Sequence, residues 1–184
     1  LYGDAGNDNL VSGGGDDNLY GGDNDDTLNA GGGNDNLYGG DNDDILTAGG
    51  GNDNLYGGNN DDTLNGGGGN DIIYGGSNSA KGDDGSVDIA VFSGASNDYK
   101  VSRATDVTFG YVYYIQDTRD DSPDGLDTLY DIDRLRFSDG DFDIETYYQE
   151  KVNGGAGDDE LTGTPGDDLI DGFGGNDTIT GLAG

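Results

Sequence analysis

Large apolar residues recur at every ninth position in the first part of the chain. The period runs without slippage through Leu1, Leu10, Leu19, Leu28, Leu37, Leu46, Leu55, Leu64 and Ile73. Gly, Asp and Asn dominate the positions between them, so each nine-residue unit offers little apolar surface to bury. A fixed period with one small apolar contribution per unit is typical of repeat proteins, in which each unit buries its apolar side chain against its neighbours.

The polar residues follow the same period. From Leu10 onward, an Asp precedes each apolar residue by two positions, giving Asp8, Asp17, Asp26, Asp35, Asp44, Asp53, Asp62 and Asp71. Two positions before each Asp lies a Gly or an Asn: Gly6, Gly15, Asn24, Gly33, Asn42, Gly51, Asn60 and Gly69. Gly and Asn adopt left-handed backbone conformations most readily, so we expect a tight loop in front of every Asp.

The composition is that of a polyanion. The 184 residues carry a formal net charge of −32, and only 30% are hydrophobic. Low hydrophobicity with high charge is typical of disorder, but disorder predicts no regular spacing. Nucleic acids and anionic membrane surfaces are excluded as partners by charge repulsion. Membrane insertion is not expected, because no apolar run is long enough to cross a bilayer. We expect a cation as the partner.

Numbered from its first Gly, the unit reads G-G-x-G-x-D-x-U-x, where U is apolar. GGDNDDTLN is one example, and GGGNDNLYG follows the same pattern starting from position 2. This pattern resembles the RTX (haemolysin-type) calcium-binding nonapeptide repeat. The resemblance covers residues 1–74 and resumes at 154–180 as GGAGDDELT, GTPGDDLID and GFGGNDTIT.

The repeat predicts an all-β fold, a parallel β-roll or β-solenoid. Each unit supplies a strand of three residues, x-U-x, whose apolar side chain points inward because side chains alternate along a strand. Two units complete one coil, and coils stack at the sheet spacing of about 4.8 Å. The RTX resemblance implies the same architecture. Stacking aligns Asp17 with Asp35 and Asp26 with Asp44, and charges about 5 Å apart repel by roughly 3 kcal/mol at an effective dielectric near 20.

Calcium is the cation that this chemistry favours. Ca²⁺ accepts six to eight oxygen ligands with flexible geometry, whereas Mg²⁺ prefers a strict octahedron and retains its waters. Zinc prefers His or Cys, and the chain contains neither. The resemblance implies several ions, each between two loops one coil apart. Positions 1, 3 and 5 of one loop and positions 2, 4 and 6 of the loop eighteen residues later would supply the oxygens.

The predicted calcium-binding residues fall into groups by position in the unit. Position 6 gives the eight aspartates above and, in the second repeat block, Asp159, Asp168 and Asp177. Positions 2 and 4 give Gly13, Gly15, Gly22, Asn24, Gly31, Gly33, Gly40, Asn42, Gly49, Gly51, Gly58, Asn60, Gly67 and Gly69. Position 5 gives Asp16, Asp25, Asn34, Asp43 and Asn52. We expect the Asn residues at position 4 to adopt the same conformation as Gly. The second block should hold one complete site, between loops 154–159 and 172–177.

Three regions are predicted: an RTX β-roll at 1–80, a non-repetitive β-rich cap or insert at 81–151, and the start of a second RTX block at 152–184. In the middle region, β-branched and aromatic content predicts strands at Val87–Phe92, Tyr99–Arg103, Phe109–Gln116 and Asp133–Phe137. Residues 145–152 are consistent with one or two helical turns. This region resembles the cap-like segments that follow RTX blocks.

The functional prediction is a calcium-binding structural and secretion module rather than an enzyme, because His and Cys nucleophiles are absent. The RTX resemblance implies type I secretion and folding outside the cell, in a larger secreted or surface protein of which this chain is an excerpt. Tyr2, Tyr20, Tyr38, Tyr56 and Tyr74 recur every eighteen residues. Tyr favours strands and stacks well on like neighbours, so a structural role on one strand face is one interpretation. The alternative is a flat surface that binds polysaccharide or ice. An adhesin, or an accessory module of a secreted enzyme, therefore remains an alternative.

Overall fold

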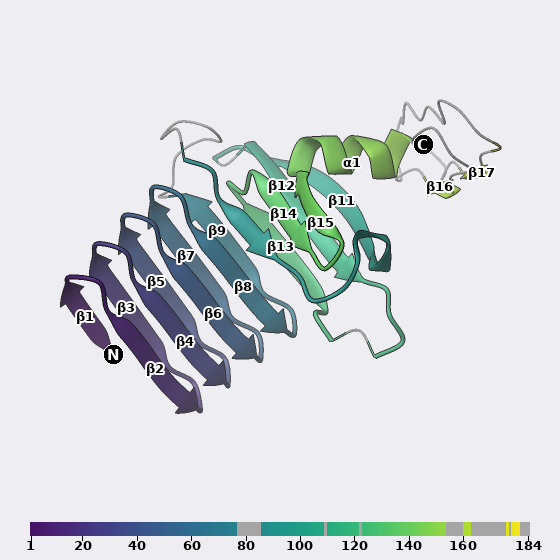
Figure 1. Ribbon diagram of the computed structural model, residues 1–184. Helices are drawn as coiled ribbons and strands as arrows, with labels where there is room; N and C mark the ends of the chain where they lie inside the picture. The colour runs from purple at the N-terminus through teal and green to yellow at the C-terminus, as the bar shows by residue number, and fades with distance from the viewer. Residues whose placement is uncertain are drawn as a thin grey trace. The chain divides into compact units, whose positions relative to one another are not determined.

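The computed structural model describes residues 1–76, 86–108, 110–121, 123–153, 160–162, 176 and 178–180. The chain divides into two compact units, Leu1–Phe142 and Asp143–Gly184. The first unit contains the repeats 1–76 and the segment that follows them, and its strands form two sheets (Figure 1).

Successive repeat strands alternate between the two sheets. The first sheet receives β1 (Tyr2–Ala5), β3 (Asn18–Asp23), β5 (Asn36–Asp41), β7 (Asn54–Asn59) and β9 (Ile72–Gly76). The second sheet receives β2 (Asn9–Gly14), β4 (Thr27–Gly32), β6 (Ile45–Gly50) and β8 (Thr63–Gly68). Each strand pairs in parallel with the strand eighteen residues later, so that Leu19 lies beside Leu37 and Leu28 beside Leu46. The predicted parallel β-roll is confirmed.

The predicted strand length of three residues is wrong. Most repeat strands have six residues and continue through positions 1 to 3 of the next unit. The glycines at position 2 remain in the parallel ladder, as in the pairing of Gly31 with Gly49. Position 1 therefore also points inward, and Ala30 and Ala48 are fully buried beside the leucines.

The core is a double row of leucines, one from each sheet. Leu19, Leu28, Leu37, Leu46, Leu55 and Leu64 are all 0% exposed, and Ile73 is 1% exposed. Burying a Leu side chain contributes about 1.5–3 kcal/mol. The roll thus obtains one such contribution per nine residues. Its stability therefore also depends on the interactions that the loop residues make.

The segment after the repeats extends both sheets. In the second sheet, β10 (Ile89–Val91) pairs in parallel with β8 and with β14 (Arg134–Phe137), and β15 (Gly140–Asp143) forms the edge. In the first sheet, β13 (Leu126–Tyr130) pairs in parallel with β9. The strands β12 (Gly110–Asp117) and β11 (Tyr99–Asp106) then complete the sheet in antiparallel order. The predicted strands correspond to β10, β11, β12 and β14, whereas β13 and β15 were not predicted.

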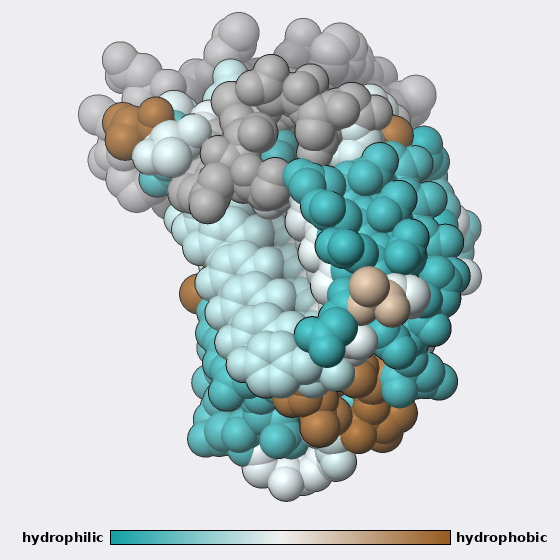
Figure 2. Space-filling view, turned by 90° about the vertical axis from the view of Figure 1, so that its left-hand side faces the viewer, coloured by the Kyte–Doolittle hydropathy of each residue, from teal (hydrophilic) through white to brown (hydrophobic). Residues whose placement is uncertain are grey.

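The tyrosines at position 9 form a continuous stack on the first sheet, which we call the Tyr ladder. It contains Tyr2, Tyr20, Tyr38, Tyr56, Tyr74 and also Tyr130 from β13, with ring centroids 4.6–4.8 Å apart. The rings appear as the pale column along the roll in Figure 2. Neighbouring planes differ by 2–11°, so every internal ring has another ring on each of its two faces.

The second unit contains the helix α1 (Ile144–Asn153), longer than the one or two turns predicted, and the strands β16 (Glu160–Thr162) and β17 (Thr178–Thr180). The helix begins where the Asp143 carboxylate accepts a hydrogen bond from the Thr146 N–H at 2.9 Å, a typical N-terminal cap. Strands β16 and β17 pair in parallel with the same eighteen-residue offset as the roll. Among the described residues, no helix has the length and hydropathy required to span a membrane.

Candidate metal centre

The loops between the strands depend on a left-handed backbone at positions 2 and 4. At position 4, Gly33 and Gly51 have φ values of 132° and 143°, and Asn24, Asn42 and Asn60 have φ values of 80–83°. The prediction that Asn adopts the same conformation as Gly is confirmed. Position 2 is also left-handed, at Gly13, Gly22, Gly31, Gly40, Gly49, Gly58 and Gly67. The carbonyl oxygens of Gly13 and Gly31 lie against Gly31 and Gly49 of the next coil, where a Cβ atom would come within 2.0 Å of them.

The aspartates at position 6 form two buried columns, one along each edge of the roll. We call Asp8, Asp26, Asp44 and Asp62 the first column and Asp17, Asp35, Asp53 and Asp71 the second column. Within each column, one carboxylate oxygen accepts a hydrogen bond from the backbone N–H of the aspartate eighteen residues earlier, at 2.7–2.9 Å. The side chains from Asp26 to Asp71 at this position are at most 2% exposed. These aspartates therefore do not form a solvent-exposed acidic face.

The second carboxylate oxygen has no partner in the part of the chain that the structure describes. This holds for the buried Oδ2 atoms of Asp8, Asp26, Asp35, Asp44, Asp53, Asp62 and Asp71. Buried polar atoms in folded proteins are almost always hydrogen-bonded, and each exception requires an explanation. Seven equivalent unpartnered Oδ2 atoms in the two columns indicate that a ligand is bound by carboxylate oxygens at successive coils of the roll.

In the first column, the free oxygens lie close to backbone carbonyl groups. A Cβ atom placed on Gly39 would come within 2.3 Å of Asp44 Oδ2 and 2.5 Å of the Gly57 carbonyl oxygen. The same arrangement recurs one coil earlier, where Gly21 lies against Asp26 Oδ2 and the Gly39 carbonyl oxygen. In the first column, each site therefore gathers a carboxylate oxygen and a carbonyl oxygen around a space that a side chain at position 1 would fill.

Burial makes the charged form of these carboxylates unfavourable. It raises the pKa of Asp44 to about 7, and nearby carboxylates, led by that of Asp26, raise it further. Burial likewise raises the pKa of Asp62 to about 8 and of Asp71 to about 7, and it raises the pKa of Asp53. The hydrogen bond from the backbone N–H lowers each pKa but does not outweigh burial. At neutral pH, each column therefore requires protons or cations.

The residues at position 5 lie on the outside of the loops. Asp16, Asp25, Asn34, Asp43 and Asn52 are exposed. The side-chain oxygens of Asp16 and Asn34 accept hydrogen bonds from the N–H groups of the residues one coil later, at 2.7 and 2.8 Å. Their side chains thus join neighbouring loops, whereas the position 6 carboxylates point inward.

The donor set fits a hard cation such as Ca²⁺. Within the described ranges, no three acidic side chains converge closely enough to hold a metal through carboxylates alone. A cation in either column would therefore take one carboxylate oxygen from an aspartate such as Asp53 and most other oxygens from backbone carbonyls. Ca²⁺ accepts this mixture, whereas Zn²⁺ prefers nitrogen and sulfur ligands.

The two columns continue beyond the repeats, which the sequence prediction missed. The Asp62 N–H donates to Asp88 Oδ1 at 2.9 Å, and the Asp88 N–H donates to Asp133 at 3.1 Å. In the second column, the Asp71 N–H donates to Asp127 Oδ1 at 2.8 Å. A signal was present, because Asp88, Asp127 and Asp133 each precede an apolar residue by two positions, as in the repeats.

The predicted sites in the second repeat block lie outside the described residues. These are Asp159, Asp168 and Asp177, together with the loops 154–159 and 172–177.

Parallel coils, left-handed Gly and Asn loops and columns of half-satisfied aspartates define a β-roll of the cation-binding class. The family model of the RTX calcium-binding nonapeptide repeat matches this chain in four copies, at residues 2–37, 20–55, 47–79 and 153–184. These matches cover more than half of the chain, which therefore belongs to this family. A comparison with curated proteins found no match. The β-roll is thus a structural module of the calcium-binding class.

Proposed function

We propose that this chain is a folding module controlled by calcium, in which each ion joins two loops one coil apart and completes the roll. The observation that carries the proposal is the row of buried Oδ2 atoms without a partner among the described residues. The proposed ligands are the position 6 carboxylates and the carbonyls of the surrounding loops, including those of the predicted sites at Asp159, Asp168 and Asp177.

Without calcium, the leucine core must overcome the cost of burying two columns of carboxylates. An unsatisfied buried polar group costs about 1–3 kcal/mol, and more when it is charged. One Leu per unit contributes an amount of similar size. Because a cation that binds only the folded state stabilises that state, calcium binding and folding become one coupled process.

This coupling suits a protein that leaves the cell unfolded and folds where calcium is abundant. We propose that the chain belongs to a larger secreted or surface protein exported by a type I system, as is typical of RTX repeat proteins. In this proposal, residues 1–80 form a first roll, 81–151 a β-rich cap or insert, and 152–184 the start of a second roll.

The test is a calcium titration of the calcium-stripped chain, followed by circular dichroism and by calorimetry. We expect a transition from a largely unfolded to a β-rich spectrum as Ca²⁺ is added, with heat and β-structure following the same curve. Mg²⁺ at equal concentration is the control and should produce little change, because it retains its waters and demands octahedral geometry. A β-rich spectrum that is unaffected by calcium removal would overturn the proposal.

The alternative function, polysaccharide or cell-surface binding through the Tyr ladder, receives support from the continuity of the ladder alone. Sugars stack on the exposed faces of aromatic rings, but the internal rings cover one another. A carbohydrate would have to contact ring edges and hydroxyl groups instead. Retention of the folded, calcium-loaded chain on immobilised polysaccharide, with loss of retention in Tyr38→Ala and Tyr56→Ala, would support this alternative.

A further inference from the structure

The second column has an additional member, Asp127, that lies outside the nonapeptide repeats. Its Oδ1 atom accepts a hydrogen bond from the Asp71 N–H at 2.8 Å, as Asp71 Oδ1 does from the Asp53 N–H at 2.9 Å. The residue after it, Thr128, donates its N–H to the Asp71 carbonyl at 2.8 Å, matching the bond from Ile72 to Asp53. Asp127 thus occupies position 6 of a further coil, although 56 residues rather than eighteen separate it from Asp71.

The loop before Asp127 also stacks like a repeat loop. Gly125 lies at position 4 with a φ of 69°, and a Cβ atom on it would come within 1.9 Å of the Gly69 carbonyl oxygen. Gly69 stands in the same relation to Gly51, at 1.7 Å. The Leu126 N–H donates to Asn70 Oδ1 at 2.9 Å, as the N–H groups of repeat residues at position 5 do within the roll.

Within the described residues, only one oxygen of the Asp127 carboxylate accepts a hydrogen bond. The side chain is buried, with 3% of the residue exposed, and its hydrogen bond from Asp71 reaches Oδ1. No hydrogen bond or ion pair from another described residue reaches its Oδ2 atom. Asp127 therefore combines a buried side chain with one oxygen that no described donor reaches.

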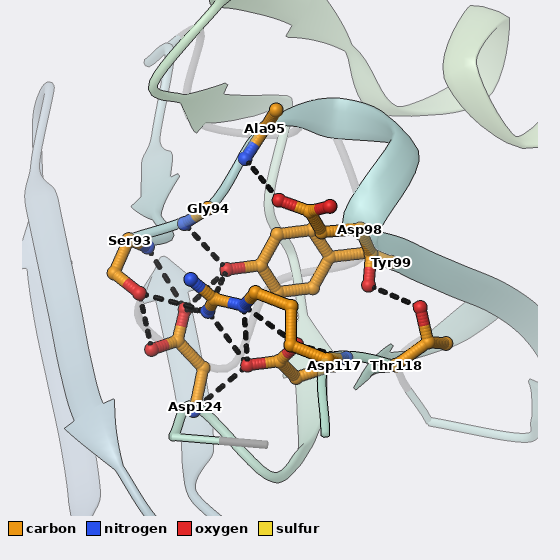
Figure 3. Close-up of polar contacts among 9 residues, drawn as sticks. Ser93, Gly94, Ala95, Asp98, Tyr99, Asp117, Thr118 and Asp124 are labelled. Atoms are coloured by element: carbon orange, nitrogen blue, oxygen red, sulfur yellow. Dashed lines mark hydrogen bonds and ion pairs between the residues drawn. The ribbon is translucent and has the colours of Figure 1, made fainter. Parts of the chain in front are cut away.

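A separate polar network holds the loop in place through Asp124 (Figure 3). The Asp124 carboxylate accepts hydrogen bonds from the Ser93 N–H at 2.8 Å and the Ser93 hydroxyl at 2.7 Å. It also accepts a hydrogen bond from the Tyr99 hydroxyl, and Arg119 Nη2 lies 3.3 Å from it. Arg119 in turn binds Asp117 at 2.6 Å. These contacts satisfy Asp124 and Asp117 and fix the position of the loop.

We propose that Asp127 completes a calcium site between loop 66–71 and loop 123–127, beyond the nonapeptide repeats of residues 1–76. Asp127 Oδ2 supplies the carboxylate oxygen, and backbone carbonyls of the two loops supply the others. Asp124 acts as a positioning residue through its contacts with Ser93, Tyr99 and Arg119. The inference rests on the proposed function, and it adds that calcium fastens the non-repetitive segment to the end of the roll.

The test compares Asp127→Asn with Asp121→Asn, which removes the same charge from an exposed aspartate of the preceding turn. Asn retains an oxygen that can accept the Asp71 N–H but lacks the second carboxylate oxygen. After dialysis against saturating Ca²⁺, elemental analysis should show one fewer ion per chain for Asp127→Asn and an unchanged number for Asp121→Asn. Hydrogen exchange should show calcium-dependent protection of residues 123–130 in the unsubstituted chain and in Asp121→Asn, but not in Asp127→Asn.

The outcomes separate this inference from the proposed function. If the unsubstituted chain binds no calcium, the proposed function fails. If it binds calcium but Asp127→Asn binds the same number of ions and retains protection at 123–130, only the inference fails. If Asp127→Asn does not fold, a crystal structure of the unsubstituted chain grown with calcium decides. A cation at about 2.3–2.6 Å from Asp127 Oδ2 supports the inference, and a water or protein donor there overturns it.

Discussion

The Asp35 N–H donates a hydrogen bond to Asp53 Oδ1 at 2.7 Å, while Asp53 Oδ2 has no partner within the described part of the chain. The two oxygens of one carboxylate therefore have different roles. Oδ1 links neighbouring coils by accepting a backbone hydrogen bond. Oδ2 is buried without compensation, so the stability of the coil depends on what is bound there.

Replacing Asp53 by Asn should separate these two roles. The amide oxygen can still accept the Asp35 N–H, but the cation loses its carboxylate ligand. We expect the calcium concentration at the midpoint of folding to rise by at least about tenfold, because even indirect contacts to a metal are worth that much. Asp121→Asn is the control, because it removes the same charge from an exposed position outside the repeat loops. Equal midpoints for the two variants would rule out a ligand role for Asp53.

The calcium-free chain should be more stable in acid than at neutral pH. The folded-state pKa values of Asp44 and Asp71 are raised to about 7 and that of Asp62 to about 8, from an ordinary value of 3.8. A raised folded-state pKa means that the folded state binds more protons than the unfolded state. The resulting stabilisation is complete below about pH 4 and is lost as the pH rises through 7–8.

Circular dichroism in calcium-stripped buffer between pH 4 and pH 9 measures this effect. We expect β-structure at the acidic end and its loss above pH 8. Added calcium should restore the structure at high pH, because the cation replaces the protons. Calcium-free chain that is equally folded at pH 5 and pH 9 would contradict the assignment of uncompensated buried carboxylates.

Much of the fold could be predicted from the period alone. One Leu and one Asp every nine residues determine which side chains point inward, and the eighteen-residue repeat determines which strands pair, as Leu37 with Leu55 shows. The strand length could not be predicted, because the glycines at positions 1 to 3 have no β-propensity of their own. They join the ladder because their neighbours one coil away present matching backbone groups.

The aspartates of the two columns could be predicted within the repeats, but those that continue the columns after the repeats could not. The positions of Asp88 and Asp127 in the columns depend on which segments return to the roll after insertions of irregular length. No local pattern determines that choice, because parallel pairing joins segments far apart in the sequence. The matches to a repeat are short, such as Gly125, Asp127, Leu129 and Tyr130 around Asp127, and they are too short to identify a coil by themselves.

The glycines at position 1 of the first column should tolerate no side chain. In Gly39→Ala, the new Cβ would meet Asp44 Oδ2 and the Gly57 carbonyl oxygen at 2.3 and 2.5 Å. We expect a loss of about 1–3 kcal/mol in unfolding free energy, as for other overpacked sites. Gly50→Ala is the matched control, because its Cβ meets nothing within 4 Å and its φ is not positive. Calcium-saturated thermal unfolding of both variants measures the difference, and equal losses would show that the contact is unimportant.

The Tyr ladder should stabilise the roll in proportion to the number of stacked neighbours. Tyr38 lies between Tyr20 and Tyr56 with both centroid distances at 4.8 Å, whereas Tyr2 has one neighbour and is 72% exposed. An aromatic pair contributes about 0.5–1.5 kcal/mol beyond its buried area. Tyr38→Ala should therefore lower the unfolding free energy by about 1–3 kcal/mol, and Tyr2→Ala by less than half of that. Thermal unfolding in saturating calcium gives both values. If neither variant loses stability, the ladder has no structural role, and its contribution must lie in binding at the surface.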